Sequence, residues 1–208
     1  MRAKRSASAE PGAPAAPGGP RLDRPRSVRA HEAVLAAAAE ILHEEGFPGA
    51  TIDAISQRSG VSKATIYNHW PTRTAVASEA LASYMRGRVR VPHTDDPRQD
   101  VIDLVVETNR FYRSRSGEVY AQLLAASVTD PEGARYFRDL FLRTRRDIFR
   151  EVWARAVESG AGNPAIDVED AIDVLFGPLL FRLMAGHIAL TDANARCLAE
   201  AALAGLGT

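Results

Sequence analysis

Five polar side chains lie within the seven residues from Lys63 to His69, and all five are of types that hydrogen-bond to DNA. They are Lys63, Thr65, Tyr67, Asn68 and His69. Ile66 and Trp70, four residues apart, would share the opposite, inward face of a helix over this stretch. A lysine can reach guanine in the major groove, and the amide of an asparagine can pair with adenine. The stretch therefore predicts a short helix that presents hydrogen-bonding groups to DNA.

A second short helix is predicted just before it, with a tight turn between the two. Thr51 can cap this helix, and Asp53 in its first turn suits the helix dipole. Gly60 suits the left-handed conformation that ends a helix, and Ser62 can cap the helix that follows. Residues 51–70 therefore predict a helix-turn-helix, in which the second helix reads the major groove.

The resemblance to a known family is closer than this general motif. Residues 28–82 resemble the N-terminal domain of the TetR family of bacterial transcriptional regulators, and residues 173–182 more weakly resemble the C-terminal domain of one TetR subgroup. The matching segments are residues 41–47, Thr51, 55–56, 60–63, 66–71 and Arg73. Ser56, Ser59, Trp70 and Arg73 depart from the usual residues of the family but keep their size or charge.

The resemblance implies roles for individual residues. Thr51, Tyr67, His69 and Arg73 would contact phosphates and set the register on DNA. Ser62, Lys63, Thr65 and Asn68 would reach base edges or nearby phosphates. The alternative for each residue alone is a solvated polar side chain on an exposed helix face.

Charge and composition agree with a DNA-binding head on a separate body. The 208 residues carry no net charge, but residues 1–92 hold 13 Lys and Arg against 8 Asp and Glu, and the remainder holds 13 against 18. A basic first part would be drawn to phosphates and an acidic second part kept away from them, although such an imbalance also arises by chance. No apolar run approaches the roughly 20 residues that span a membrane, so a cytoplasmic protein is expected. The single cysteine, Cys197, excludes an internal disulfide.

The sequence pattern predicts three regions, and their helices must position these side chains. Residues 1–26 are rich in proline, glycine and arginine and predict a disordered tail, either simply solvated or reaching the DNA as a basic arm. Residues 27–88 predict the DNA-binding domain, with Ser27 capping its first helix, Gly46 ending that helix and a linking helix after Pro71. Residues 89–208 predict a helical regulatory and dimerisation domain, with a helix break at 116–117 and a kink or interruption at 177–178. No alternating strand pattern occurs, so the fold class is all-α, with about nine helices.

By family resemblance the C-terminal region would form a homodimer and bind a ligand. Two heads about 34 Å apart would read a near-palindromic operator in double-stranded DNA. The apolar stripe expected to form a four-helix bundle with its copy, or else an ordinary core, comprises Leu175, Leu179, Leu183, Leu198 and Ala202. Aromatic residues that would line a ligand pocket, or simply pack, are Phe111, Tyr112, Tyr120, Phe137, Phe141 and Trp153. They favour an unknown, largely apolar small-molecule effector, with or without an acidic group held by an arginine.

Sequence motifs typical of enzymes are absent or have a simpler explanation. Asp95, Asp96 and Asp100 are similar to an aspartate-rich magnesium motif, but helix capping explains them more simply. No nucleophile elbow, Walker loop or paired histidine spacing occurs, so no catalytic residue, metal site or cofactor is predicted. The sequence favours a repressor released from its operator by a ligand. The alternatives are an activator or ligand-independent regulator, and a small-molecule binding or enzymatic module whose DNA binding is vestigial.

Overall fold

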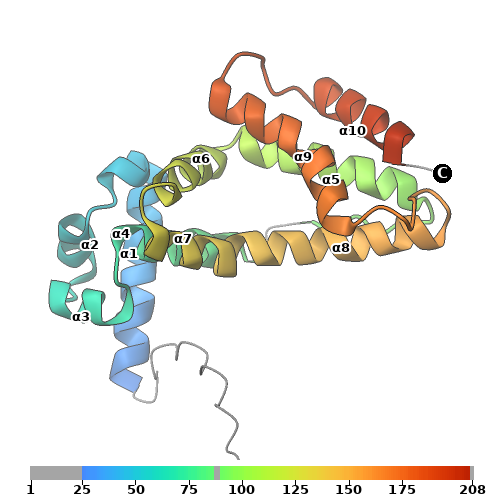
Figure 1. Ribbon diagram of the computed structural model, residues 1–208. Helices are drawn as coiled ribbons and strands as arrows, with labels where there is room; N and C mark the ends of the chain where they lie inside the picture. Colours follow the sequence, from blue (N-terminus) through green and yellow to red (C-terminus); the bar gives the residue numbers. More distant parts are fainter. Residues whose placement is uncertain (1–24, 87–89, 207–208) are drawn as a thin grey trace, which may run out of the picture.

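The computed structural model describes residues 25–86 and 90–206, and this part of the chain is built of helices joined by loops, without a strand (Figure 1). The all-α fold class is therefore confirmed. The predicted tail up to residue 24 and the predicted domain boundary at 88–89 lie outside the described residues.

The head is formed by α1 (Pro25–Gly49), α2 (Ile52–Ser59), α3 (Lys63–His69) and α4 (Arg73–Met85). The predicted cap at Ser27 is wrong, because α1 begins two residues earlier and Ser27 lies in its first turn. Residues 25 and 26, the last two of the predicted tail, therefore belong to this helix. Proline is well suited to that first position because it has no N–H group to leave unpaired. Gly46 breaks the helix with a φ of 73°, as predicted, and the chain then makes one more turn to Gly49.

Local capping bonds form the predicted helix-turn-helix. The hydroxyl of Thr51 accepts a hydrogen bond from the N–H of Ala54 at 3.1 Å, and the hydroxyl of Ser62 accepts one from Thr65 at 3.2 Å. Gly60 ends α2 with a φ of 69°. Ile66 and Trp70 are buried in the core of the head, which leaves the other face of α3 to solvent.

The body begins with α5 (Pro97–Tyr112) and α6 (Arg115–Ser127). The expected break at 116–117 is wrong, because α6 already starts at Arg115 and the hydroxyl of Ser114 caps it by accepting from the N–H of Gly117. A Cβ on Gly117 would lie 2.3 Å from the carbonyl oxygen of Phe111. The glycine therefore permits the tight packing of the α5–α6 turn and does not end a helix.

A long helical rod follows, in which α7 (Pro131–Tyr136), the π-helical segment η1 (Phe137–Leu142) and α8 (Arg143–Glu158) are continuous. α9 (Val168–Ala185) and α10 (Asp192–Leu206) complete the body. With this rod taken as one unit, the described residues form nine helical units, as expected. α9 runs through Pro178 without interruption and ends at Gly186, where φ is 62°.

One buried ion pair fixes α5 against α8. The carboxylate of Asp100 is fully buried, accepts hydrogen bonds from Thr94 and pairs with Arg155 at 2.7 Å. Burial alone would raise the pKa of Asp100, but the hydrogen bonds from Thr94 and the charge of Arg155 outweigh it and hold the pKa below its ordinary value. Asp96 caps α5 by accepting from the N–H of Gln99. Asp96 is therefore a helix cap, as predicted, whereas Asp100 has a structural role in a buried ion pair that capping did not predict.

Head and body share one hydrophobic core. α4 packs against α7 and η1, and α1 packs against α6 (Figure 1). At the α4–α7 contact, a Cβ on Gly133 would come within 2.4 Å of the Cβ of Thr74. The body therefore touches the head close to the start of α4, which directly follows α3.

Candidate DNA-binding face and ligand cavity

The predicted DNA-binding side chains gather on α3 and around its two ends. α2 and α3 lie at the end of the molecule away from α9 and α10 (Figure 1). Tyr67 is 53% exposed, and Lys63 and Asn68 are also exposed on α3. Thr51 is exposed at the start of α2, and the hydroxyls of Ser62 and Thr65 lie 2.9 Å apart at the start of α3. The arrangement can present hydrogen-bond donors and acceptors to a groove of DNA.

Lys63 has a partner within the head that the sequence patterns did not indicate. Its ammonium group forms an ion pair with the carboxylate of Asp53 on α2. The hydrogen bond from Lys63 to Asp53 and the charge of Asp53 raise the pKa of Lys63. Because both side chains are more than half exposed, solvent screens the pair and Lys63 can exchange Asp53 for DNA.

His69 and Arg73 are less free than the other candidates. The ring of His69 is half-buried and packs edge-on against His31, with centroids 5.7 Å apart. Arg73 is also half-buried, and its guanidinium lies 4.2 Å from the ring centre of Phe47. A phosphate contact from either residue would have to form at the edge of the head.

A polar contact that the sequence analysis missed holds α3 in place. The indole N–H of Trp70 donates to the carboxylate of Glu79 on α4 at 2.6 Å. The other oxygen of that carboxylate lies 2.8 Å from the ring nitrogen of His31 on α1, and the His31 ring stacks on Trp70. The end of α3 is therefore tied to both α1 and α4.

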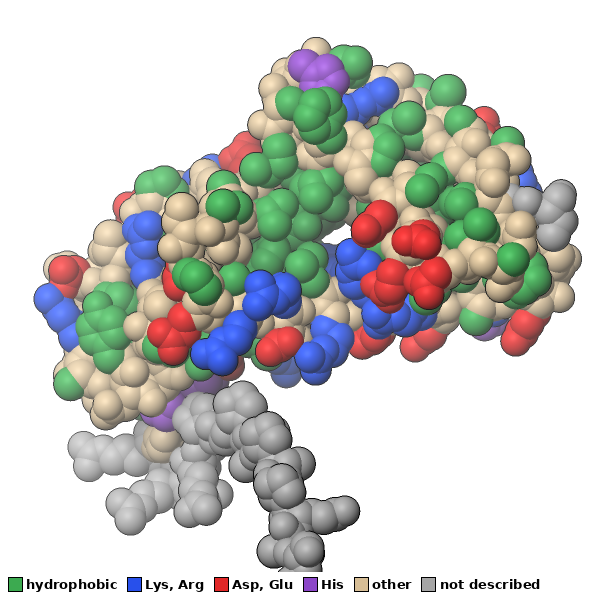
Figure 2. Space-filling view, in the orientation of Figure 1, with side chains coloured by type: hydrophobic (Ala, Val, Ile, Leu, Met, Phe, Trp, Pro, Cys, Tyr) green, Lys and Arg blue, Asp and Glu red, His purple; other side chains and the backbone are tan. Residues whose placement is uncertain are grey.

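A cavity of about 450 Å³ lies inside the body, within the range of small-molecule pockets. Figure 2 shows hydrophobic side chains gathered in a hollow where α6, α8 and α9 meet, with charged side chains at its edge near α8. The lining residues come from α5, α6, η1, α8 and α9. They are Leu104, Thr108, Phe111, Tyr112, Tyr120, Leu124, Phe141, Leu142, Arg145, Arg146, Ile148, Phe149, Ile172, Asp173, Phe176, Gly177 and Leu180.

Four of the six aromatic residues that the sequence suggested line the cavity: Phe111, Tyr112, Tyr120 and Phe141. Phe137 and Trp153 do not line it. Phe137 stacks behind Phe141 with ring centres 5.7 Å apart, and Trp153 stacks on Phe149 at 5.9 Å. Both lie on the apolar side of the rod, so one-dimensional spacing could not separate them from the lining residues.

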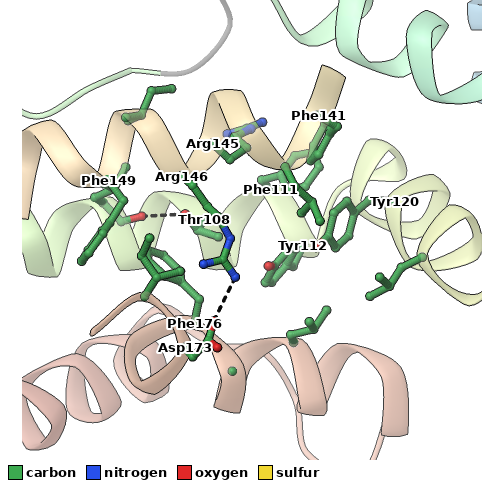
Figure 3. A pocket seen from close by; sticks show the side chains of 17 residues that line it. Thr108, Phe111, Tyr112, Tyr120, Phe141, Arg145, Arg146, Phe149, Asp173 and Phe176 are labelled. Carbon is green, nitrogen blue, oxygen red and sulfur yellow. Dashed lines mark hydrogen bonds and ion pairs between the residues drawn. The ribbon is translucent and has the colours of Figure 1, made fainter. Parts of the chain in front are cut away.

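The sequence analysis allowed for an arginine at the cavity but named none of its charged residues. Arg146 reaches across from α8 to Asp173 on α9, with a nitrogen-to-oxygen distance of 3.0 Å (Figure 3). It also pairs with Glu169. Arg145 lies beside Phe111 and Phe141, with its guanidinium 4.9 Å and 5.2 Å from the two ring centres. A sequence signal for Arg145 existed, because it interrupts an apolar row at every fourth residue between Phe141 and Phe149.

Tyr112 and Tyr120 stack on each other at the cavity wall, with ring centres 5.5 Å apart. Burial raises the pKa of Tyr112 well above its ordinary value, and burial also raises that of Tyr120. Both hydroxyls are therefore neutral at physiological pH, and because they hydrogen-bond to each other, one O–H is left to donate elsewhere.

The five apolar residues that the sequence suggested for dimerisation are buried or half-buried within a single chain. Leu175 and Leu179 are buried, and Leu183, Leu198 and Ala202 are half-buried. The large apolar side chains that α9 and the following loop leave exposed are different ones. They are Val174, Phe181, Met184 and Ile188.

Comparison with known proteins identifies the family that has this architecture. Residues 91–202, more than half of the chain, match the family model described as "Tetracyclin repressor-like, C-terminal domain", and residues 34–80 match "Bacterial regulatory proteins, tetR family". The chain belongs to the TetR family of transcriptional regulators.

Individual relatives agree with this assignment. The TetR-family chain is 33% identical to the HTH-type transcriptional regulator YdeS of Bacillus subtilis over 183 residues, which cover 88% of this chain and 92% of YdeS. It is similar to the crystal structure of the TetR family regulator SCO0332, with a TM-score of 0.75, 29% identity and coverage of 86% and 100% of the two chains. The fold is also that of FadR from Bacillus subtilis in complex with stearoyl-CoA, with a TM-score of 0.57, 15% identity and coverage of 85% and 99%.

These relatives of the TetR-family chain are transcriptional regulators and not enzymes. Within residues 25–86 and 90–206, none of the helices has the length and apolar character needed to cross a membrane.

Proposed function

We propose that this TetR-family regulator is a homodimeric repressor, which binds a near-palindromic operator and is released when a largely apolar small molecule occupies the cavity. The observation that carries the proposal is the continuous rod from Pro131 to Glu158, because one part of it lines the cavity and its first turns pack on α4. Its proposed partner is chromosomal DNA, so we place the protein in the cytoplasm.

The DNA contact would be made by the face of α3 and the caps around it. Tyr67, Lys63 and Asn68 are exposed together on α3. Thr51, Ser62, Thr65, His69 and Arg73 would complete the contact at the edges. Phosphate contacts would set the register, and Lys63 and Asn68 would read bases.

Two routes connect the cavity to this face. Along the first, Phe141 and Arg145 line the cavity and belong to the rod that packs on α4 through Gly133. Asp130 at the start of this rod caps it by accepting from the N–H of Gly133 at 2.9 Å and also interacts with the hydroxyls of Thr72 and Thr74 at the start of α4. A ligand that displaces the rod would therefore move the helix next to α3.

The second route runs through α6. Tyr120 and Leu124 of α6 line the cavity, while Gln122 accepts a hydrogen bond from the N–H of Phe47 at 2.7 Å. Arg115 at the start of α6 donates to the carbonyl oxygen of His43 at 2.9 Å. Both contacts hold the C-terminal end of α1, so α6 and the rod would reposition the head together.

A homodimer would use the exposed apolar side of α9. Val174, Phe181 and Met184 are each at least 46% exposed there, and exposed apolar clusters commonly mark interfaces. Pairing two copies would place the two heads at the spacing of successive major-groove faces, about 34 Å apart.

Fluorescence anisotropy on DNA from the flank of the protein's own gene, against scrambled DNA, tests the proposal. At about 150 mM salt, we expect tight binding to the operator with two subunits per site and weak, salt-sensitive binding to scrambled DNA. Equal and weak binding to both DNAs would contradict sequence-specific regulation by that site. Selective binding that activates transcription in a reporter assay would contradict repression.

A further inference from the structure

One charged side chain of the cavity has no counter-ion in the described part of the chain. Arg145 forms no ion pair there, and one of its terminal nitrogens, Nη2, is buried without a hydrogen-bond partner. It stands in the middle of an otherwise apolar row formed by Phe137, Phe141 and Phe149. A guanidinium in such a row is costly unless something compensates its charge.

The other charges at the cavity already have partners. Arg146 pairs with Asp173 and Glu169, and Glu169 also pairs with Arg150. Among the residues that line the cavity, the charged ones are two arginines, Arg145 and Arg146, and one carboxylate, Asp173. The cavity is left with one excess positive charge, which belongs to Arg145.

The surroundings of Arg145 compensate its charge only in part. The faces of Phe111 and Phe141 attract the cation, but an aromatic ring supplies neither a full negative charge nor an acceptor for the N–H groups. Burial lowers the pKa of Arg145, although a guanidinium still remains protonated at physiological pH. Arg145 therefore brings to the cavity wall a charged side chain that still has one unsatisfied donor.

The wall beside Arg145 offers a further donor. The neutral hydroxyls of Tyr112 and Tyr120 hydrogen-bond to each other, which leaves one O–H for a ligand, and the remaining surface of the cavity is mostly apolar (Figure 3). A carboxylate has two oxygens that can accept from a guanidinium and a hydroxyl together. A single excess charge matches a monoanion better than a multiply charged group such as a phosphate ester.

We propose that the effector is a monocarboxylic acid with an aromatic or alkyl body, whose carboxylate binds Arg145 while the body fills the apolar part of the cavity. This inference rests on the proposed function in that it treats the cavity as the effector site. The carboxylate would replace the missing counter-ion, and Arg146 and Asp173 would stay paired at the opposite wall.

Isothermal titration of the full chain without DNA tests this inference separately from operator binding. The probes are biphenyl-4-carboxylate and decanoate, each compared with its primary amide, which has nearly the same shape but no charge. We expect at least one acid to bind, and to bind at least about tenfold more tightly than its amide, since hydrogen bonds between charged groups are stronger than those to a neutral group.

Two variants test whether Arg145 is the residue that binds the carboxylate. Arg145→Gln should weaken binding of the acid about tenfold or more and leave binding of the amide unchanged. Arg143→Gln is the matched control, because Arg143 lies on the same helix but pairs with Asp139 on the exposed side, away from the cavity. It should leave both affinities unchanged.

Three results would overturn the inference. They are equal affinity for acid and amide in the unmodified chain, no binding of either acid, and equal loss in Arg143→Gln and Arg145→Gln. The acid-to-amide comparison needs no variant, so it holds even if Arg145→Gln fails to fold. If an acid binds through Arg145 but does not release operator DNA, the carboxylate site stands and ligand-released repression is wrong.

Discussion

Tyr67 projects from α3 with 53% of its surface exposed, whereas its neighbour Ile66 is fully buried. We expect Tyr67→Ala to weaken operator binding about tenfold or more while folding stability and dimerisation stay unchanged, because the side chain would contact phosphate but not the core. Anisotropy measures the affinity, and circular dichroism and sedimentation measure fold and assembly.

Tyr67→Phe is the control that separates the hydroxyl from the ring. If the hydroxyl donates to a phosphate, this variant should lose nearly as much affinity as Tyr67→Ala. Unchanged operator affinity in Tyr67→Ala would remove Tyr67 from the DNA contact.

Asp100 provides a test of stability at the residue scale. We expect Asp100→Asn to lower the free energy of unfolding at pH 7 by about 3 kcal/mol, because it leaves Arg155 without its buried partner. Thermal or urea unfolding of both proteins across pH measures the difference.

The sign of the pH dependence follows from the lowered pKa of Asp100. A carboxylate with a lower pKa in the folded state stabilises the fold above its unfolded pKa of about 3.9, and this contribution is lost as pH falls through the folded value. The difference between Asp100→Asn and the unmodified protein should therefore be constant near neutral pH and shrink below about pH 4. A difference that grows in acid would contradict the ion pair.

At the scale of elements, the rod formed by α7, η1 and α8 connects cavity and head. Gly133→Ala tests this contact, because a Cβ there would lie 2.4 Å both from the Cβ of Thr74 on α4 and from the carboxylate of Asp130, which caps the rod. We expect this variant to lose about 1–3 kcal/mol of unfolding free energy, as overpacked sites do, and to change operator affinity by moving α4. Urea unfolding and anisotropy measure the two effects.

Gly205→Ala on α10 is the matched control, because a Cβ there meets nothing within 4 Å. It should stabilise the protein slightly, by up to about 1 kcal/mol, since alanine favours helices over glycine. If Gly133→Ala behaves like this control, the α4–α7 contact is not tight and the first proposed route loses its support.

Elements with local causes could be predicted from the sequence. The caps at Thr51, Ser62 and Asp96 involve bonds to residues three positions away, so the sequence contains both partners. Gly117 shows where this reasoning failed. Its neighbours in sequence suggested a helix break, but its role depends on close packing against the carbonyl of Phe111 across a turn.

At the scale of the whole molecule, the proposed dimer can be tested on the exposed side of α9. We expect Phe181→Glu to convert the dimer to a monomer and to weaken operator binding, because Phe181 is 65% exposed in one chain and a charge would be buried in the interface. Light scattering after size-exclusion chromatography measures the mass in solution.

Val128→Glu is the matched control, because Val128 is 82% exposed but follows α6, away from α9. It should leave the mass and the operator affinity unchanged. A dimer that persists in Phe181→Glu would show that another surface joins the two copies.

The sequence by itself determined the family, the all-α class and the helix-turn-helix, because these depend on short-range caps, glycines and the spacing of buried residues along one helix. Only the tertiary structure decided which side chains share the cavity and which charges remain unpaired there. Phe137 and Phe141 have the same spacing pattern, yet only Phe141 lines the cavity. Asp173 and Arg146 are 27 residues apart and meet only because α8 and α9 pack across the cavity. Whether Arg145 has a counter-ion is likewise set by helices distant in sequence, since a charge is compensated by its neighbours in space.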